Sequence, residues 1–200
     1  MFHNFYNILE SPVIYRLVQM ILAPGGERTL RKLIPELLGD RMLQDWLDVG
    51  CGPKSLLPPL QGKRFGVDIS PRYLLANETF SNCSAAADAS SLPFKTGSFA
   101  GALTIGLLHH LPDESAKKVL LEMIRVCGND GKIIVIDAVL PRFAWRRPLA
   151  EIIRRADRGN FMRRQTEFVS ILPKHIDWKV ERTTYTWNGL EMLVAQTGRI

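Results

Sequence analysis

Three short apolar stretches of this sequence each end in residues that are able to hold a small ligand. The first, residues 46–49, runs into Gly50-Cys51-Gly52 and then Pro53. Because glycine has no Cβ, such a turn lets the backbone approach a ligand closely. Proline is favoured at the first position of a helix, so Pro53 predicts a short helix whose free amide groups face an anionic group.

Aspartates end the next two apolar stretches. Asp68 follows residues 64–67, and Asp88 follows residues 85–87. A carboxylate accepts two hydrogen bonds from the neighbouring hydroxyls of a ribose, or one from the exocyclic amino group of adenine. Ligands of an open parallel sheet bind beyond the carboxyl ends of its strands. The glycine turn and the two carboxylates therefore predict a site for an adenosine that carries a carboxylate tail.

The glycine turn does not match the two common phosphate-binding loops. The dinucleotide fingerprint GxGxxG needs a third glycine where this chain has Ser55, and a Walker loop needs a glycine directly before Lys54-Ser55. A nucleotide phosphate is therefore disfavoured. An NAD(P)-binding oxidoreductase, in which Asp68 would again hold a ribose, stays an alternative.

Strands and helices alternate in the part of the chain that would position these residues. The clearest helix is predicted over 113–127, and two amphipathic stretches, 12–22 and 27–38, predict helices before the first strand. Helix-compatible stretches separate the strand candidates, which predicts a βαβ series and a mostly parallel sheet. The strand candidates are residues 46–49, 64–67, 85–87, 102–105 and 132–136.

The alternation of strands and helices lapses after residue 140. One helix is predicted with an apolar face formed by Leu149, Ile152, Ile153 and Ala156, and a second with Thr166 as its N-cap. The tail predicts a hairpin in which Asn188-Gly189 joins residues 180–187 to residues 190–197, because Asn-Gly between two β-rich runs is a strong hairpin signal.

Five motifs of the chain, in order and spacing, resemble those of class I S-adenosylmethionine-dependent methyltransferases of the type 11-like group. The resemblance covers about residues 45–140, and it rests on LDVGCGP (47–53), GVDIS (66–70), ADASSLPF (87–94), SFAGALTIGLLHHLPDE (98–114) and GKIIVIDAV (131–139). It implies an α/β, doubly wound, Rossmann-like and mostly parallel sheet of seven strands, with a C-terminal antiparallel hairpin and N-terminal cap helices.

The resemblance also implies S-adenosyl-L-methionine as cofactor and assigns residues to it. Gly50 and Gly52 would face its methionine end and Asp68 its ribose. Further cofactor residues are implied beside the adenine (Ile69), at the adenine edge (Asp88, Ala89), next to the methyl donor (Ile105, Gly106) and within the first motif (Asp48, Cys51). Lys54 departs from the family pattern, because it stands where the loop usually has its third glycine.

His109 and His110 stand in the stretch that lines the active site in the family. A histidine near the methyl donor could take a proton from a hydroxyl nucleophile, because its pKa lies close to working pH. Adjacent residues at the start of a helix point in different directions, so at most one of the pair would face the pocket. We assign the catalytic role to His109; the alternative is that both histidines only shape the loop.

Eight arginines crowd the segment between Arg142 and Arg164, which holds only two acidic residues, and this excess of six equals the net charge of the whole chain, +6. The arginines could ring a solvated helix face. In the family, however, this segment forms the substrate wall, so Arg154 and Arg155 would recruit an acidic acceptor. The same arginines would also suit peripheral contact with an anionic membrane.

Composition bounds the remaining classes. At 200 residues with 46% hydrophobic residues, the chain is long enough for one domain with a real core. Its three cysteines are far apart, which disfavours a disulfide scaffold or zinc knuckle, so no metal is predicted. The sparse cysteines suit a reducing compartment, and the sequence has neither a signal peptide nor an apolar run of ~18–20 residues. These features predict a soluble, cytoplasmic protein.

The single domain over 1–200 would contain four parts: N-terminal helices (1–40), a cofactor-binding core (45–140), a basic helical substrate cap (141–175) and a closing hairpin (176–200). We expect methyl transfer by in-line displacement to a small or amphiphilic, lipid-like and acidic acceptor. No Asn/Asp-Pro-Pro-aromatic signature follows the fourth strand candidate, which disfavours a nucleic-acid acceptor. A catalytically idle methyltransferase-like module that binds an acidic partner is a further alternative.

Overall fold

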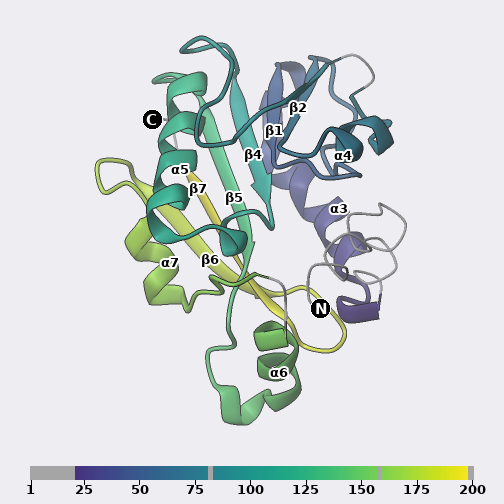
Figure 1. Cartoon of the computed structure of the whole chain (residues 1–200), viewed down its shortest axis with the longest axis vertical. Coiled ribbons are helices and arrows are strands. Elements are labelled where there is room, and N and C mark those ends of the chain that lie inside the picture. The colour runs from purple at the N-terminus through teal and green to yellow at the C-terminus, as the bar shows by residue number, and fades with distance from the viewer. Residues whose placement is uncertain (1–20, 81–82, 157–158, 198–200) are drawn as a thin grey trace, which may run out of the picture.

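The computed structural model describes residues 21–80, 83–156 and 159–197, which fold around one seven-stranded sheet (Figure 1). Strands β1 to β5 run parallel, and β7 is antiparallel to both of its neighbours, β5 and β6. The spatial order is β3-β2-β1-β4-β5-β7-β6, as the predicted fold class requires. The strands are β1 (Trp46–Val49), β2 (Arg64–Asp68), β3 (Ser84–Ala86), β4 (Gly101–Ile105), β5 (Lys132–Ala138), β6 (Trp178–Thr184) and β7 (Glu191–Thr197).

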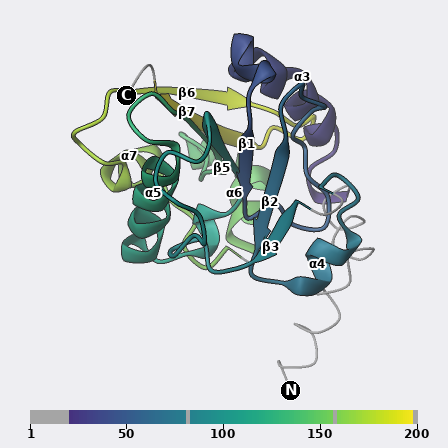
Figure 2. The same cartoon turned by 90° about the horizontal axis from the view of Figure 1, so that it is seen from above.

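Helices cover both faces of the sheet, which makes the fold doubly wound. Figure 2 shows α3 on one side and α5 with α7 on the other. The helices are α3 (Gly26–Leu38), α4 (Pro71–Ala76), α5 (Asp113–Cys127), α6 (Pro148–Ala156) and α7 (Gln165–Ile171), with short 3-10 turns η1 (Gly39–Leu43), η2 (Leu108–His110) and η3 (Ala144–Arg146). The predicted helix over 12–22 lies outside the described residues, except for its last two positions, which are helical.

Two apolar layers hold the helices on the sheet. On one side, α5 buries Val119, Leu120 and Met123, which follow the three- and four-residue spacing of a helix face. On the other, Leu30 and Ile34 of α3 pack in one cluster with the fully buried Trp46 of β1. The central strands are buried on both faces, as a parallel sheet between helices requires.

The connection from β1 to β2 contains no helix, so the helix predicted after Pro53 is wrong. Residues 52–54 form a turn, and residues 55–63 continue without helical structure. Pro58 and Pro59 explain the difference, because proline lacks an amide hydrogen and drives the residue before it away from helical backbone angles. Amide groups of the turn therefore face the edge of the sheet without a helix behind them.

Three local predictions also need correction. Strand β3 begins and ends one residue earlier than predicted, and β5 continues to Ala138, so Asp137 lies within the strand. The N-cap of α7 is Arg164 rather than Thr166, and the carboxylate of Glu167 accepts a hydrogen bond of 2.6 Å from the backbone amide of Arg164.

The predicted apolar face of α6 is also wrong. Leu149 and Ile152 are exposed, while Ala150 and Arg154 are buried. The helix is turned because its buried side is held by polar contacts of Arg154 with the β6–β7 hairpin.

Candidate active site

The predicted cofactor residues gather at the carboxyl edge of four adjacent strands. Val49 pairs with Val67 of β2 on one side and with Thr104 of β4 on the other. Asp68 pairs with Ala86, two residues before Asp88. The order of the strands reverses between β1 and β4, and such a switch point is where open α/β sheets bind their ligands. The fold therefore brings together the residues that the sequence places far apart.

The glycine turn after β1 is held in a left-handed conformation. Gly50 and Gly52 have φ angles of +70° and +59°, which residues with a Cβ rarely adopt. Gly50 packs against Leu107, whereas a Cβ added to Gly52 would meet no described atom within 4 Å. Cys51 turns its side chain into the core, and burial raises the pKa of its thiol. Only the backbone of Cys51 is thus presented to the site, on the open side next to Gly52.

Asp68 joins the glycine turn to the end of β2. Its Oδ2 accepts a hydrogen bond of 2.9 Å from the amide of Gly52, and its Oδ1 accepts one of 2.8 Å from the amide of Ser70. Burial raises the pKa of Asp68, and the two amide hydrogen bonds oppose this rise. A carboxylate has about four acceptor positions, so two remain for a further donor.

Asp48 lies beneath the turn rather than on its open side. Its side chain is only 2% exposed, and it accepts a hydrogen bond from the hydroxyl of Ser55, whose oxygen in turn accepts one from the amide of Leu57. Burial, helped by the nearby Asp68, raises the pKa of Asp48 to about 7. In the described structure Asp48 supports the turn, and Ser55, which the sequence offered only as a departure from GxGxxG, is its partner.

Two further residues, neither of them predicted to support the turn, fix it from outside. The side-chain amide of Asn77, at the end of α4, donates to the carbonyl of Gly52 over 2.8 Å. Lys54 donates to Glu27 of α3 over 2.7 Å, so the lysine that replaces the usual glycine ties the turn to a neighbouring helix. No sequence motif marks Asn77, because its partner is a backbone atom 25 residues away.

The adenine side of the predicted site is open. Ile69 is 76% exposed directly after Asp68, although it is a large apolar residue. Asp88 accepts hydrogen bonds from the amide and the hydroxyl of Ser90, both through Oδ1, and these bonds lower its pKa. Asp88 is therefore an ionised residue that forms a turn with Ser90, and its exposed carboxylate is also in place as an acceptor. Ala89 beside it packs partly against the core.

A histidine on the loop after β4 pairs with an aspartate of β5. Ile105 ends β4, and Gly106, with a φ of +65°, turns the chain into η2. Asp137 is buried near the end of β5; it accepts from the backbone amide of His109 over 2.9 Å and lies 2.5 Å from the imidazole Nδ1. The carboxylate acts as an acceptor for both groups, so it orients the ring. In the sequence Asp137 directly follows the predicted strand over 132–136, and nothing there indicates its partner.

The basic cap segment packs directly on this loop. A Cβ at Gly159 would lie 2.2 Å from the imidazole of His109, so only glycine fits there. The amide of Phe161 donates to the carbonyl of His109. Arg163 is buried, donates to the carbonyls of Leu108 and Leu111, and pairs with Asp113 over 2.8 Å. The predicted base, His109, and the segment predicted to form the substrate wall are therefore neighbours.

Arg154 and Arg155 do not form one acidic-acceptor site. Arg154 is buried and donates to the Tyr185 hydroxyl over 2.9 Å and to the carbonyl of Glu191 over 3.1 Å. Arg155 is exposed and pairs with the buried Glu151 over 2.8 Å. Consecutive residues of a helix lie about 100° apart around the axis, which explains the split. The substrate role predicted for Arg154 is corrected to a structural one, while that of Arg155 stays a prediction.

A hollow of about 1210 Å³ opens elsewhere, at the amino-terminal edge of the sheet, and Gln44, Asp45 and Lys132 are among its lining residues. It contains none of the predicted cofactor residues, so we place the candidate site by the strand-end geometry instead. Within the described ranges, no cluster of three or more His, Cys, Asp or Glu side chains could hold a metal ion. No helix in that part of the chain is both long and apolar enough to cross a bilayer.

Comparison with known proteins bears on the domain and its fold. Residues 47–135 match the family model described as "Methyltransferase domain". This range begins in β1 and ends in β5, so it contains the glycine turn, both aspartates and η2. No curated protein sequence matches the chain significantly. A methyltransferase domain sets aside the NAD(P)-binding oxidoreductase as an alternative.

Solved structures share the fold at low sequence identity. A SAM-dependent methyltransferase from Thermotoga maritima, described as a possible histamine N-methyltransferase, has a TM-score of 0.72 and 18% identity, with 98% of this chain and 100% of that chain covered. Geranyl diphosphate C-methyltransferase from Streptomyces coelicolor has a TM-score of 0.67 and 10% identity, with 87% and 81% covered.

A third structure, 1,6-didemethyltoxoflavin-N1-methyltransferase from Burkholderia thailandensis, has a TM-score of 0.66 and 18% identity, with 98% of this chain and 88% of that chain covered. The strand order, the motif series and the family match lead to one assignment. Residues 47–135 of this chain match a methyltransferase domain, and the described chain has the fold of S-adenosylmethionine-dependent methyltransferases.

Proposed function

We propose that the chain transfers a methyl group to a small or amphiphilic, acidic acceptor, and that the cofactor lies across the carboxyl ends of β1, β2, β3 and β4. The observation that carries this proposal is the convergence of Gly52, Asp68 and Asp88 on neighbouring strand ends.

The residues present fit S-adenosyl-L-methionine. Gly52 leaves open space on the side where a Cβ would stand, which suits close approach of the methionine part. Asp68 keeps acceptor positions for the ribose after its two amide hydrogen bonds are counted. Ile69 offers an exposed apolar surface to the adenine ring, and Asp88 an ionised acceptor to its amino group.

When bound, the cofactor supplies a methyl group on a sulfonium, which an O, N or C atom of the acceptor would take by in-line displacement. The chain itself mainly aligns the two reactants and excludes water. Gly106 and η2 would flank the acceptor side, and the cap segment, fixed to η2 by Arg163, would close it.

An acidic, amphiphilic acceptor fits the composition of the cap. Its surface combines Arg155 and Arg164 with exposed apolar side chains such as Phe161. The neighbour from Streptomyces coelicolor was crystallised with geranyl diphosphate, which is an acceptor-sized molecule with an apolar chain and an anionic group. This parallel supports the class of acceptor and not its identity.

His109 has two candidate roles in this reaction. As a base, it would accept the acceptor's proton, and Asp137 would stabilise the imidazolium that forms. As a positioning residue, it would hold η2 on β5 through the same contacts. A pH–rate profile separates these roles, because only the base gives a rate that falls with protonation of one group. His109→Gln should abolish that limb, while the neighbouring exposed His110→Gln should keep it; an unchanged profile for His109→Gln assigns the positioning role.

Calorimetric titration with S-adenosylhomocysteine tests the cofactor site, and a methyl-transfer screen of acidic metabolites tests the acceptor. We expect micromolar binding and turnover with at least one anionic acceptor. Charge reversal of Arg155 should raise the KM for the acceptor without changing the affinity for S-adenosylhomocysteine. Failure to bind S-adenosylhomocysteine at millimolar concentration would refute the site, and turnover restricted to cationic acceptors would refute the acceptor class.

A further inference from the structure

The cap segment presents large apolar side chains to solvent at one end of the molecule. Trp145 in η3 is 74% exposed, and Leu149 and Ile152, three residues apart on α6, are 58% and 64% exposed. Phe143 lies half-exposed beside them, with its ring centroid 6.5 Å from that of Trp145. We call these four residues the cap patch. Large apolar side chains gathered in this way mark an interaction surface.

Arginines are interleaved with the cap patch. The guanidinium of Arg146 lies over the rings of both Trp145 and Phe143, at 4.7 Å and 5.3 Å from their centroids, and that of Arg142 lies 5.4 Å from the Phe143 ring. From residue 138 to residue 152 the sequence has one acidic residue, Glu151, and its side chain is buried. The charges that lie against the rings of the cap patch are therefore positive, so the patch complements an anionic surface.

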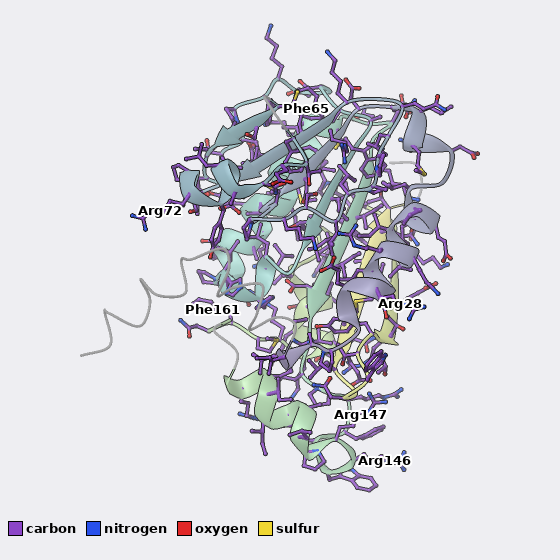
Figure 3. All side chains as sticks on the ribbon, turned by 90° about the vertical axis from the view of Figure 1, so that its right-hand side faces the viewer. Arg28, Phe65, Arg72, Arg146, Arg147 and Phe161 are labelled. Atoms are coloured by element: carbon purple, nitrogen blue, oxygen red, sulfur yellow. The ribbon has the colours of Figure 1, made fainter. Side chains whose placement is uncertain are left out.

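The patch lies at an end of the molecule that the rest of the described residues leaves accessible. Figure 1 shows α6 projecting beyond the end of the sheet toward which β4 points. In Figure 3, Arg146 and Arg147 lie at this end, far from Phe65 at the opposite one. Arg147 fastens the segment by donating to Thr184 and to the carbonyl of Gly189, so the patch is carried on the β6–β7 hairpin as a fixed surface.

From this arrangement we infer that the cap patch docks on an anionic phospholipid bilayer. Tryptophan with arginine at its side, next to exposed leucine and isoleucine, suits the boundary between headgroups and acyl chains, where apolar side chains enter and guanidinium groups meet phosphates. Docking would turn the carboxyl edge of the sheet, and with it the candidate active site, toward the bilayer. The inference stands on the surface alone and does not depend on methyl transfer.

Co-sedimentation of the full chain with vesicles tests this inference. We expect binding to phosphatidylcholine vesicles that contain about one-third phosphatidylglycerol, weaker binding to pure phosphatidylcholine, and a loss of affinity as salt is raised. Trp145→Ala should weaken binding about tenfold. The double variant of Arg142→Gln and Arg146→Gln should weaken it about thirtyfold, because each arginine near such a surface contributes about fivefold.

Matched variants on other faces serve as controls. Leu121 on α5 is exposed, as is Arg28 on α3 (Figure 3), so Leu121→Ala and Arg28→Gln should bind vesicles like the parent chain. Circular dichroism checks that every variant folds, and a blue shift of tryptophan emission on vesicles, lost in Trp145→Ala, provides a second readout. The inference would be overturned by equal binding to neutral and anionic vesicles, or by an equal loss of binding in the control variants. It would also be overturned if the chain bound none of the vesicles, and that result would point to a protein partner.

Discussion

Replacing Asp68 by asparagine separates ligand binding from folding. The carboxylate accepts from the amides of Gly52 and Ser70 and is proposed to accept from two ribose hydroxyls. Asparagine keeps the shape, but it removes the charge and turns one acceptor into a donor. Hydrogen bonds to a charged group contribute about 1.5–3 kcal/mol each, so a net loss of about 2–4 kcal/mol of binding free energy is expected, which is roughly a 30- to 700-fold rise in Kd.

Asp45 provides the matched control for this substitution. It also accepts a backbone amide, that of Lys63, over 2.7 Å, but it lies next to the other end of β1. Asp45→Asn should lower the thermal midpoint to a similar degree and leave the Kd of S-adenosylhomocysteine unchanged by calorimetry. A Kd of Asp68→Asn within threefold of the parent value would refute the ribose assignment. Equal loss of affinity in both variants would show that folding, and not recognition, carries the effect.

Three further predictions concern the turn, its buried support and the cap. Gly52→Ala and Gly39→Ala both force a Cβ into a positive-φ position with no described atom within 4 Å, so each should destabilise the fold by about 1–2 kcal/mol, while only Gly52→Ala should weaken S-adenosylhomocysteine binding in calorimetry. Burial raises the pKa of Asp48 from 3.8 to about 7. Protonation of Asp48 therefore stabilises the folded state, and this stabilisation is lost as the pH rises from about 4 to about 7. Asp48→Asn should remove that fall, about 4 kcal/mol, from the pH dependence of the free energy of unfolding in urea titrations. Arg163→Ala should cost about 3 kcal/mol of stability, because it strips buried carbonyls of their donors, whereas Lys117→Ala, which breaks the exposed ion pair with Glu114, should cost less than about 1 kcal/mol in the same titrations.

The sequence predicted the parallel core well because each strand there is a short apolar run that ends in a polar residue. The strand over 46–49 and the helix over 113–127 were predicted to the residue. The helix after Pro53 failed because the glycine turn was weighed alone, whereas Pro58 and Pro59 decide the backbone of the whole connection. Local patterns predict local structure, and this connection depends on residues beyond the motif.

The cofactor residues at strand ends could be proposed from sequence, since the fold class fixes where strand ends meet. Their supports could not, because the contacts are between side chains and distant backbone atoms. Asn77 reaches the carbonyl of Gly52, and Asp137 reaches His109 across 28 residues. The orientation of α6 could not be predicted either, because it depends on the hydrogen bonds of Arg154 with Tyr185 and Glu191 and not on the apolar periodicity of the helix.

The proline-rich connection between β1 and β2 changes how the ligand-facing turn obtains its rigidity. A helical connection would order this stretch through its own ladder of hydrogen bonds. Here Pro53, Pro58 and Pro59 restrict the unfolded chain instead, so less conformational entropy is lost when the stretch folds. The order of this connection thus comes from the proline rings, so it does not fray as the ends of a helix do. Replacing a single proline would therefore increase the flexibility of the whole connection.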